Sequence, residues 1–492
     1  MSEFWATFGV DLYLELDTAT GRRSGLEHAL RDAVRAGRLA PGARMPSTRK
    51  LAAELGLSRG TVSAAYDQLI AEGYLTARRG SGTTVADLTR RPAPAPPPRQ
   101  DAVAPRYDLR PGSPDVGIFP AEAWVRSTRR ALAASSAEAY DYGDPRGRIE
   151  LRVALAEYLG RTRGVLATPG QIVITSGYVQ GLALLARVLG DAGTAAIAME
   201  DPGLGFHREV VRRAGPAVVA LPVDGRGARP DLLRDHERVD AVVVTPAHQY
   251  PTGVTLHPAR RRALTEWARA HDGLIVEDDY DGEFRYDRQP VGALQGMAPD
   301  HVAYLGSASK TLGPALRLGW MALPHRLVEP VVDAKLHLDH HTEAVGQLAL
   351  ADLITTHVYD RHIRACRLHY RRRRDLLLAR LGSIPGLAVQ GIAAGLHAMV
   401  TLPAGGPGEQ ETLAHASARG VALGSLGGHW HRPGDHPQAI IVGYGTPRAH
   451  VYPAALDTLA RVLTQEQPSR HLRSRTDPPD TGPGRARDDR MR

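Results

Sequence analysis

Short apolar runs separated by segments of helical periodicity fill most of the chain. Polar loops follow several of these runs. This alternation of strand-like and helix-like segments indicates an α/β domain with a mainly parallel sheet. In that architecture sites form at the carboxyl ends of the strands, so we expect the chemistry in the loops after the runs. The runs expected to form strands are 172–174, 195–197, 218–221, 242–244, 274–276, 302–305 and 318–321.

The amino-terminal part of the chain follows a different pattern. Leu26, Leu30 and Val34 recur at four-residue intervals, which predicts an amphipathic helix over 25–38. Two further helices are separated by a glycine, and each is preceded by a serine that can cap it, as in a helix-turn-helix. Two strands around an arginine and glycine turn complete a winged helix. We expect the later helices at 49–55 and 58–72, and the strands at 74–77 and 83–85.

A winged helix of this kind places its third helix in the major groove of DNA, with the first turn at the base edges. Positive charge in the preceding helix and in the wing would contact phosphates or the minor groove. The alternative is a three-helix protein-interaction domain whose basic face is only solvated. The expected DNA-binding residues are Ser58, Arg59 and Thr61 at the bases, and Arg49, Arg79 and Gly80 at the backbone or minor groove.

Composition restricts the class of protein. The 492 residues are 43% hydrophobic, which is enough for two or three domains, one of them large. The formal net charge of +8 favours an anionic partner. The single cysteine excludes an internal disulfide framework, and the sequence contains neither a signal-peptide pattern nor an apolar run of membrane-spanning length. We therefore expect a cytoplasmic, nucleoid-associated protein without membrane contact.

A proline-rich segment separates the two parts of the chain. Residues 87–106 are unsuited to a helix or a central strand, so we expect a semi-rigid, extended linker there. The charged, proline-containing segment 466–492 is expected to be disordered. The expected organisation is a DNA-binding module at 11–86, the linker, a large domain at 107–465 and the tail.

The segment 304–317 carries the strongest signal for chemistry. A buried strand runs into a polar loop that holds Lys310, with Ser307 and Ser309 before it and Arg317 after it. A lysine whose pKa is lowered attacks aldehydes, while hydroxyls and a guanidinium suit a phosphate. Pyridoxal phosphate (PLP) carries both groups. An ordinary surface lysine is the alternative, but the chain has three lysines among 61 Lys and Arg residues, which favours a chemical role for Lys310.

Polar loops also follow three other expected strands. The loop 175–180 precedes a helix expected at 181–189, so its amides can bind a phosphate. Acids at 277–281 could keep a pyridine nitrogen protonated, although clustered acids also suit Mg²⁺. The Schiff-base lysine favours the first interpretation, so no metal ion is expected. The loop 245–253 contains His248, which is either a proton-transfer group near the site or a loop residue bonded to backbone; since no second partner is evident in the sequence, we favour the latter.

Two parts of the chain resemble known families. Residues 11–86 resemble the GntR family of bacterial DNA-binding domains, and residues 107–465 are similar to fold-type I PLP enzymes of the aminotransferase class I/II group. The second resemblance implies a smaller α+β subdomain at the carboxyl end. The whole chain resembles the MocR subfamily of GntR regulators, and its PdxR-like branch in particular. The GntR resemblance rests on Pro46-Ser47-Thr48-Arg49, Leu57-Ser58-Arg59-Gly60-Thr61-Val62, Glu72-Gly73-Tyr74-Leu75 and Gly80-Ser81-Gly82-Thr83.

The resemblance implies roles for individual residues. Lys310 matches the lysine that forms the Schiff base with PLP. Asp278 matches the acid at the pyridine nitrogen, and Tyr280 the tyrosine near the cofactor's 3-oxygen. Tyr142 matches a tyrosine that reaches the phosphate from the other subunit, which implies a homodimer. The other residues expected around the cofactor are Tyr250 and, at the phosphate, Gly177, Tyr178, Val179, Ser307, Ser309 and Arg317.

Three positions depart from a working aminotransferase. Tyr250 replaces the asparagine before Pro-Thr-Gly, and Leu204 replaces a common tyrosine. Ile441 stands where the arginine that clamps the substrate carboxylate is expected. Since a bidentate arginine binds and orients a carboxylate, its loss argues against transamination, unless Arg432 or Arg448 substitutes for it.

The combined interpretation is a DNA-binding transcriptional regulator that binds PLP through Lys310. It would sense PLP itself, as a signal for vitamin B6 metabolism, or an amino compound. The alternatives are a working PLP-dependent aminotransferase that carries a DNA-binding domain, and a DNA-binding protein whose large domain holds no cofactor. These motifs do not encode the operator, the half-site arrangement or the sign of regulation.

Overall fold

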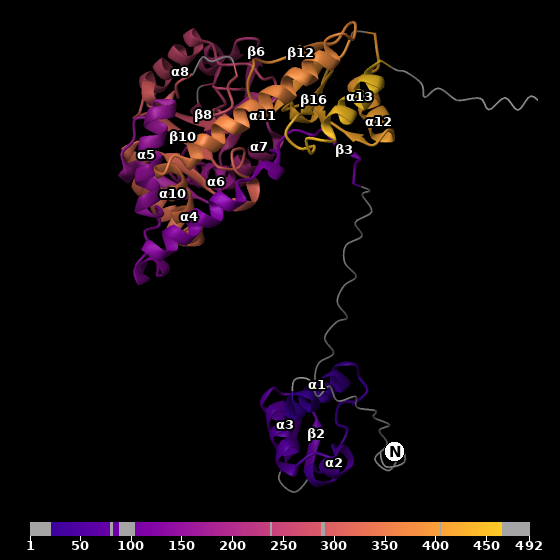
Figure 1. Cartoon of the computed structure of the whole chain (residues 1–492). Coiled ribbons are helices and arrows are strands. Elements are labelled where there is room, and N and C mark those ends of the chain that lie inside the picture. Colours follow the sequence, from indigo (N-terminus) through magenta and orange to yellow (C-terminus); the bar gives the residue numbers. More distant parts are fainter. Residues whose placement is uncertain are drawn as a thin grey trace, which may run out of the picture. The chain divides into compact units, whose positions relative to one another are not determined.

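The chain divides into two compact units between Val103 and Ala104, and each unit has its own hydrophobic core (Figure 1). The computed structural model describes residues 21–78, 82–87, 104–236, 239–286, 291–403 and 405–464. Most of the expected linker and the expected tail lie outside these residues. Each unit is therefore described by itself.

The amino-terminal unit is a winged helix-turn-helix, as predicted. Ser47 Oγ accepts a hydrogen bond from the backbone N–H of Lys50, and Ser58 Oγ accepts one from that of Thr61, so both serines cap helices. The apolar faces of the helices and the two antiparallel strands close over one core. The elements are α1 (Arg22–Arg35), α2 (Thr48–Leu55), α3 (Arg59–Ala71), β1 (Leu75–Arg78) and β2 (Gly82–Val85).

An eight-stranded sheet forms the centre of the larger unit. In spatial order its strands are β4 (Ile172–Thr175), β11 (Gly319–Ala322), β10 (Val302–Ser307), β9 (Leu274–Asp279), β8 (Val239–Val244), β5 (Ala196–Asp201), β6 (Ala217–Asp224) and β7 (Gly227–Ala228). The pairs from β10 to β6 are parallel, whereas β11 runs antiparallel to β4 and β10. The predicted α/β architecture with a mainly parallel sheet is confirmed.

Helices cover both faces of this sheet because its strands are apolar on both sides. Val302 and Tyr304 contribute to the cores on one face, and Ala303 and Leu305 to the core on the other. The first face packs against α5 (Ile149–Arg163), α8 (Pro258–Ala270) and α10 (Ala344–Thr355). The second packs against α6 (Tyr178–Asp191), α7 (Gly205–Ala214) and α9 (His325–Asp339). Helix α4 (Ala121–Ala134) packs on α10.

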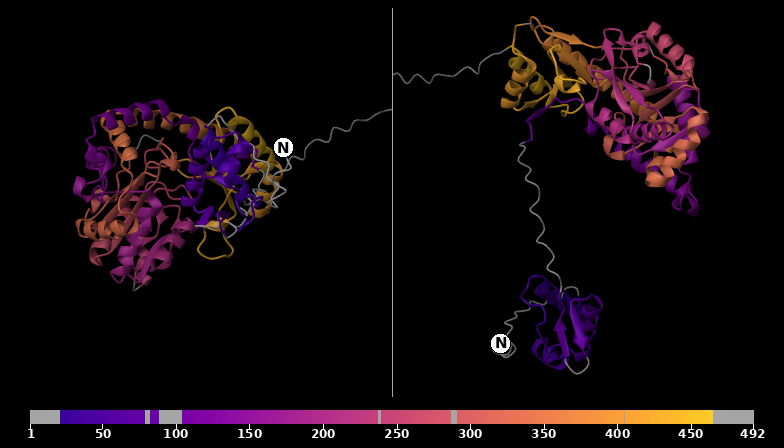
Figure 2. Two further views of the ribbon diagram at one scale, coloured as in Figure 1. Left: turned by 90° about the horizontal axis from the view of Figure 1, so that it is seen from below. Right: turned by 180° about the vertical axis from the view of Figure 1, so that it is seen from behind.

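A smaller α+β subdomain follows at the carboxyl end, as expected. Figure 2 shows its strands and helices gathered beside the large sheet in both views. The long helix α11 (Val358–Leu381) joins the two parts, since Tyr359 and Ile363 belong to the core of the large sheet and Tyr370 and Leu377 to that of the subdomain. The other elements are the sheet β12 (Ala388–Gln390), β13 (His397–Thr401), β16 (Ala439–Gly443) and β15 (Gly424–Ser425), the pair β14 (Val421–Ala422) and β3 (Tyr107–Asp108), and the helices α12 (Glu409–Ala418) and α13 (Tyr452–Leu463).

The strands β4, β5, β8, β9 and β10 all end at the same edge of the large sheet, so the loops after them converge. Two expectations about this edge need correction. Helix α6 begins at Tyr178 rather than at 181, which makes Tyr178 and Val179 its first residues. Asp278 and Asp279 lie within β9 and not in the loop after it.

Among the described residues, no helix combines the length and the apolar character needed to cross a membrane.

Candidate functional site

A pocket of about 380 Å³ lies at this edge of the sheet. Most of the residues expected around a cofactor line it, although they come from five segments of the chain. Gly177 lies under the side chain of Arg317, which lines the pocket. Tyr142 does not line the pocket. The expected residues in the lining are Tyr178, Val179, Tyr250, Asp278, Tyr280, Ser307, Ser309, Lys310 and Arg317.

Lys310 enters the pocket from the loop that follows β10. Its Nζ donates a hydrogen bond to the backbone carbonyl of Gly112. Burial lowers the pKa of the Lys310 amine, against the opposing charges of Asp281 and Asp278. A lower pKa leaves more of the amine unprotonated and nucleophilic at neutral pH. Lys335, in contrast, is fully buried and pairs with Asp339 at 2.6 Å, so its role is structural.

One end of the pocket is suited to a phosphate. The amino terminus of α6 opens here, directly after Gly177, and presents free backbone N–H groups. Ser307, Ser309 and Arg317 add hydroxyls and a guanidinium. Gly177 has a φ of 90°, and a Cβ on it would lie 3.1 Å from Nη1 of Arg317, so this position requires glycine.

A second polar feature of the pocket, besides the phosphate end, is Asp278. Its Oδ1 and the hydroxyl of Tyr178 are buried, and neither has a hydrogen-bond partner among the described residues. Burial raises the pKa of Asp278 well above its ordinary value, opposed by the nearby hydroxyl of Tyr178 and reinforced by the carboxylates of Asp279 and Asp281. A protonated pyridine nitrogen would supply both the missing donor and the missing positive charge. The lining residues therefore fit PLP, with its phosphate at α6 and its ring nitrogen at Asp278.

The neighbouring acids do not form a cation site. Glu277 accepts hydrogen bonds from two backbone N–H groups on the far side of the strand. Asp279 pairs with buried Arg163 at 2.7 Å and accepts the hydroxyl of Tyr304. Because these carboxylates point to different partners, the Mg²⁺ alternative has no geometric support.

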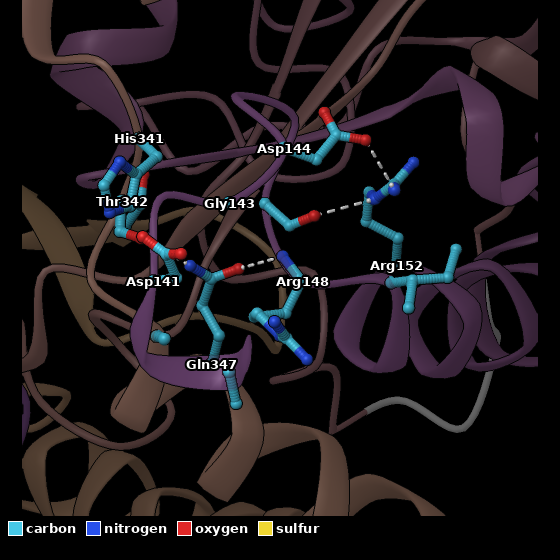
Figure 3. Close-up of a pocket in the computed structure, with 12 residues that line it drawn as sticks. Asp141, Gly143, Asp144, Arg148, Arg152, His341, Thr342 and Gln347 are labelled. Carbon is cyan, nitrogen blue, oxygen red and sulfur yellow. Dashed lines mark hydrogen bonds and ion pairs between the residues drawn. The ribbon is translucent and has the colours of Figure 1, made fainter. Parts of the chain in front are cut away.

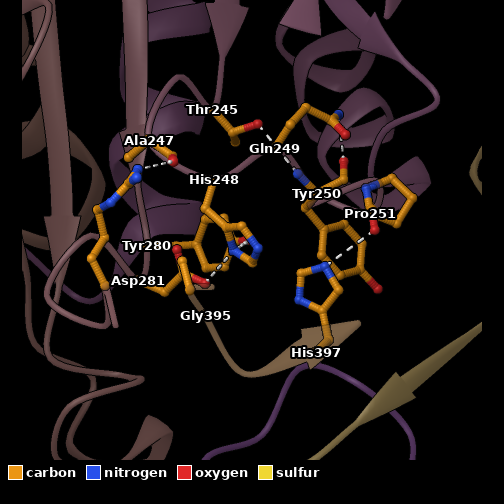
Figure 4. A network of polar contacts seen from close by, with 12 residues as sticks. Thr245, Ala247, His248, Gln249, Tyr250, Pro251, Tyr280, Asp281, Gly395 and His397 are labelled. Atoms are coloured by element: carbon orange, nitrogen blue, oxygen red, sulfur yellow. Dashed lines mark hydrogen bonds and ion pairs between the residues drawn. The ribbon is translucent and has the colours of Figure 1, made fainter. Parts of the chain in front are cut away.

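Tyr280 is connected to a buried network beside the pocket (Figure 4). His248 Nδ1 lies 2.8 Å from Oδ2 of Asp281 and 3.1 Å from the hydroxyl of Tyr280. The interpretation of His248 as a loop residue bonded to backbone was wrong, because its partner is a carboxylate brought from β9 by the fold. Nearby, Nε2 of His397 donates to the backbone carbonyl of Pro251, 3.2 Å away.

Several pocket residues were not predicted from the sequence, among them three polar residues from β5 and α7. Glu200, at the end of β5, accepts hydrogen bonds on Oε2 from Thr245 and Gln249, and burial raises its pKa to about 7. His207 has a pKa lowered to about 4 by burial and by the charge of Lys310, so it is neutral. Arg208 is the third. The sequence contained a signal for these residues. Asp201-Pro202-Gly203 stands at the end of a strand and precedes a helix, and this position places polar side chains at the edge of the sheet where sites form.

The carboxylate-binding end of an aminotransferase has no counterpart among the pocket side chains. Ile441 is buried within β16. Arg432 and Arg448 are exposed and do not line the pocket, so neither supplies the missing guanidinium. Arg208 lines the pocket, but its guanidinium donates to the carbonyls of Gly203, His429 and Trp430.

Tyr142 lies on the surface, with 79% of its area exposed, beside the rings of His340 and His341. A hollow of about 280 Å³ opens next to it (Figure 3). In this hollow Gln347 accepts the backbone N–H of Arg148. The expected contact of Tyr142 with a phosphate of another subunit stays a prediction.

The expected DNA-contacting residues gather at the amino-terminal ends of α2 and α3. Arg49, Ser58 and Arg59 are exposed and Thr61 is half-buried. The hydroxyls of Ser58 and Thr61 are 2.8 Å apart, so the helix cap also fixes the position of Thr61. Arg79 and Gly80 of the wing lie outside the described residues.

Comparison with known proteins agrees with both units. Residues 22–85 match the family described as bacterial regulatory proteins, gntR family, and residues 108–419 match aminotransferase class I and II. The chain is 34% identical over 425 residues to the HTH-type pyridoxine biosynthesis transcriptional regulator PdxR of Corynebacterium glutamicum. The matched residues cover 86% of this chain and 91% of that protein. The chain belongs to the MocR type of GntR-family transcriptional regulators.

Other relatives show the same domain combination or the same fold. The probable rhizopine catabolism regulatory protein MocR of Rhizobium meliloti is 35% identical over 390 residues, covering 75% of this chain and 78% of that protein. Pyrococcus horikoshii kynurenine aminotransferase, solved in complex with PMP, superposes with a TM-score of 0.66 at 27% identity over 73% of this chain and 90% of its own. The large unit of this MocR-type chain thus has an aminotransferase fold.

Proposed function

We propose that this MocR-type regulator binds operator DNA with its winged helix and PLP in the pocket around Lys310, and that PLP itself is its signal. The proposal rests on one combination of features. A single pocket brings together Lys310, the unpaired Asp278 and a phosphate-binding end formed by Gly177 and Arg317, and it lacks an arginine that could bind a substrate carboxylate. The similarity to the pyridoxine biosynthesis regulator of Corynebacterium glutamicum supports the same signal.

Each pocket residue has a defined task in this proposal. Lys310 is the amine that holds the cofactor aldehyde covalently, and Arg317 neutralises the phosphate at the start of α6. Asp278 accepts a hydrogen bond from the ring nitrogen, which removes the cost of its unpaired buried oxygen. When bound, PLP supplies an electron-withdrawing ring that activates amino compounds.

The pocket is better suited to sensing than to transamination. An amino acid substrate needs a partner for its carboxylate, but Ile441 is apolar and buried and Arg208 is committed to three backbone carbonyls. Without such a clamp, an amino acid would be bound weakly and oriented poorly. An amine or an amino compound without a carboxylate remains the second candidate effector, favoured by the carboxyl group of Glu200 in the pocket wall.

We also propose that the protein is a homodimer through the surface around Tyr142. Apolar side chains of this region, of α5 and of the ends of α9 and α10 are exposed, and the ring of Tyr142 packs on His340 and His341 just after α9. Exposed apolar side chains that gather on one surface are typical of a subunit interface. The exposed residues are Tyr140, Tyr142, Ile149, Val153, Leu336, Leu338 and Val345.

In a dimer of this kind, two winged helices would read two half-sites of one operator. PLP changes DNA affinity only if it prefers one arrangement of the two large units over another. The proposal therefore requires PLP, and not merely dimerisation, to alter DNA binding.

The test combines an absorbance spectrum with a DNA gel-shift titration. Wild-type protein mixed with PLP should gain a visible band that Lys310→Ala and Lys310→Arg both lack, since arginine keeps the charge but forms no Schiff base. The affinity for its own upstream DNA should change on addition of PLP in the wild type and not in either variant. A band with unchanged DNA affinity would point to an amino compound as the effector, and no band would refute PLP binding.

A further inference from the structure

A histidine and a carboxylate stand behind Tyr280 in the wall of the pocket. His248 and Asp281 do not line the pocket, and their side chains are 2% and 1% exposed. His248 Nδ1 is 2.8 Å from Asp281 Oδ2 and 3.1 Å from the Tyr280 hydroxyl (Figure 4). These two residues thus reach the pocket through Tyr280 and, by the ring of His248, through His397, whose ring centroid is 5.0 Å away.

The cluster is held in place by the backbone at Gly395. This glycine has a φ of 72°, and a Cβ on it would collide with the ring of His248 and come within 2.6 Å of Asp281 Oδ2. The hydroxyls of Tyr286 and Tyr444 donate to the Gly395 carbonyl at 2.6 and 2.8 Å. The close packing leaves His248 little freedom to turn away from Asp281.

The distances determine where the protons lie. An ionised carboxylate only accepts hydrogen bonds, so the 2.8 Å contact requires the proton of the imidazole to be on Nδ1. The oxygen of Tyr280 then faces an N–H and not a lone pair. Its own O–H cannot donate to His248, so its possible acceptors are the carboxylate of Asp281 and a group in the pocket that Tyr280 lines. Oδ2 of Asp281 already accepts the hydrogen of His248, which favours the pocket as the direction of the Tyr280 hydrogen.

We propose that His248 and Asp281 are positioning residues that aim the hydroxyl hydrogen of Tyr280 into the pocket, as a donor to a ligand oxygen. The ligand class is one with an anionic phenol or enol oxygen at this place, which the 3-oxygen of PLP would supply. Only this last assignment rests on the proposed function, since the proton arrangement belongs to the protein alone.

The other titratable groups around Tyr280 leave this arrangement intact at neutral pH. Burial, then the charges of Asp281 and Asp278, raise the pKa of the Tyr280 phenol well above its ordinary value, so it keeps its proton. Tyr250, whose pKa rises to about 12 through burial, is also neutral. Burial and the neighbouring His248 lower the pKa of His397 well below its ordinary value, so its ring adds no charge. The cations near this wall include the Lys310 amine and the guanidinium of Arg285, which donates to the carbonyl of Ala247 beside His248.

The first experiment needs no cofactor. Protein labelled with ¹⁵N in histidine and free of PLP should show His248 as the Nδ1–H tautomer in long-range ¹H–¹⁵N correlation spectra. Its signals are identified by their loss in His248→Asn. An Nε2–H tautomer, or a His248 that exchanges between tautomers, would overturn the proposal, whether or not the protein binds PLP.

The second experiment uses the PLP-loaded protein and its visible absorbance as a function of pH. Asparagine places an N–H close to the position of Nδ1, whereas glutamine places it near Nε2. The pH midpoint of the chromophore should therefore stay near the wild-type value in His248→Asn. It should rise by about one unit or more in His248→Gln and Asp281→Asn, as it should in Tyr280→Phe, because a hydrogen bond to the ligand oxyanion is lost.

Equal midpoints in His248→Asn and His248→Gln would overturn the positioning role. The two variants differ in where the side chain places its N–H, and a residue with a merely structural role would not make the midpoint depend on that place. If PLP gives no chromophore but His248 is the Nδ1–H tautomer, the proposed cofactor fails and the proton arrangement stands. The two proposals can therefore fail separately.

Discussion

The guanidinium of Arg317 packs directly over Gly177, so that a single methyl group on that glycine would come within 3.1 Å of it. The two residues are 140 positions apart and lie in different loops, one before α6 and one after β10. Their contact places a cation at the amino terminus of a helix. Both features attract a phosphate, and they do so at the same point of the pocket.

Gly177→Ala should therefore weaken PLP binding. The side chain would be strained at a φ of 90° and would displace Arg317 from its place. We expect PLP affinity to fall roughly ten- to thirtyfold, which corresponds to about 1.4–2 kcal/mol. Titration of PLP followed by absorbance measures this. Gly313→Ala is the matched control, because a Cβ at Gly313 meets nothing within 4 Å. Equal affinities in the two variants would contradict this account of the phosphate end.

Glu200 should make the stability of the cofactor-free protein depend on pH. Its pKa is raised from 4.5 to about 7 in the folded protein, mainly by burial, so folding favours the protonated form. Stability is then greatest below pH 4.5 and decreases as pH rises towards 7, by up to about 3 kcal/mol for this group. Glu200→Gln removes the titrating group, and its amide oxygen can still accept from Thr245 and Gln249.

The measurement is the difference in unfolding free energy between Glu200→Gln and wild type from pH 5 to pH 8. Glu277 and Glu283, whose pKa values are also raised to about 7, contribute equally to both proteins and cancel. The advantage of the glutamine variant should grow with pH. A difference that is constant across this range would show that Glu200 titrates normally.

A residue of this site can be predicted from the sequence only where its role follows from the residues next to it in the chain. Lys310, Ser307 and Ser309 follow a strand, and a strand end in a parallel sheet is a site by topology. His248 could not be interpreted correctly, because its partner Asp281 is 33 residues away and meets it only when β8 and β9 are paired. The partners of Arg208 could not be predicted for the same reason, since the carbonyls of His429 and Trp430 belong to the carboxyl-terminal subdomain.

That contact of Arg208 should matter for stability. Its guanidinium is buried and donates to three carbonyls on both sides of the junction between the large sheet and the subdomain. Arg208→Met keeps the length of the side chain but removes the donor to the carbonyls of Gly203 and Trp430, while the carbonyl of His429 keeps the backbone N–H of Gly203. We expect the unfolding free energy of the large unit to fall by roughly 2–4 kcal/mol. Urea denaturation measures this, with exposed Arg212→Met on the same helix as a control that should change little.

The winged helix offers a test in which two arginines have different consequences. Arg59 is exposed in the first turn of α3, where a side chain reaches base edges. Arg59→Ala should therefore cost about 1–3 kcal/mol of binding free energy on the operator and much less on unrelated DNA. Arg49 is exposed at the start of α2. Arg49→Ala should weaken binding to both DNAs alike and lower the slope of log affinity against log salt by about one. Gel shifts at several salt concentrations separate the two effects. Arg23→Ala on α1, where Arg23 pairs with Glu27, is the control that should leave both quantities unchanged. If Arg59→Ala lost affinity equally on operator and unrelated DNA, α3 would not be the helix that reads the bases.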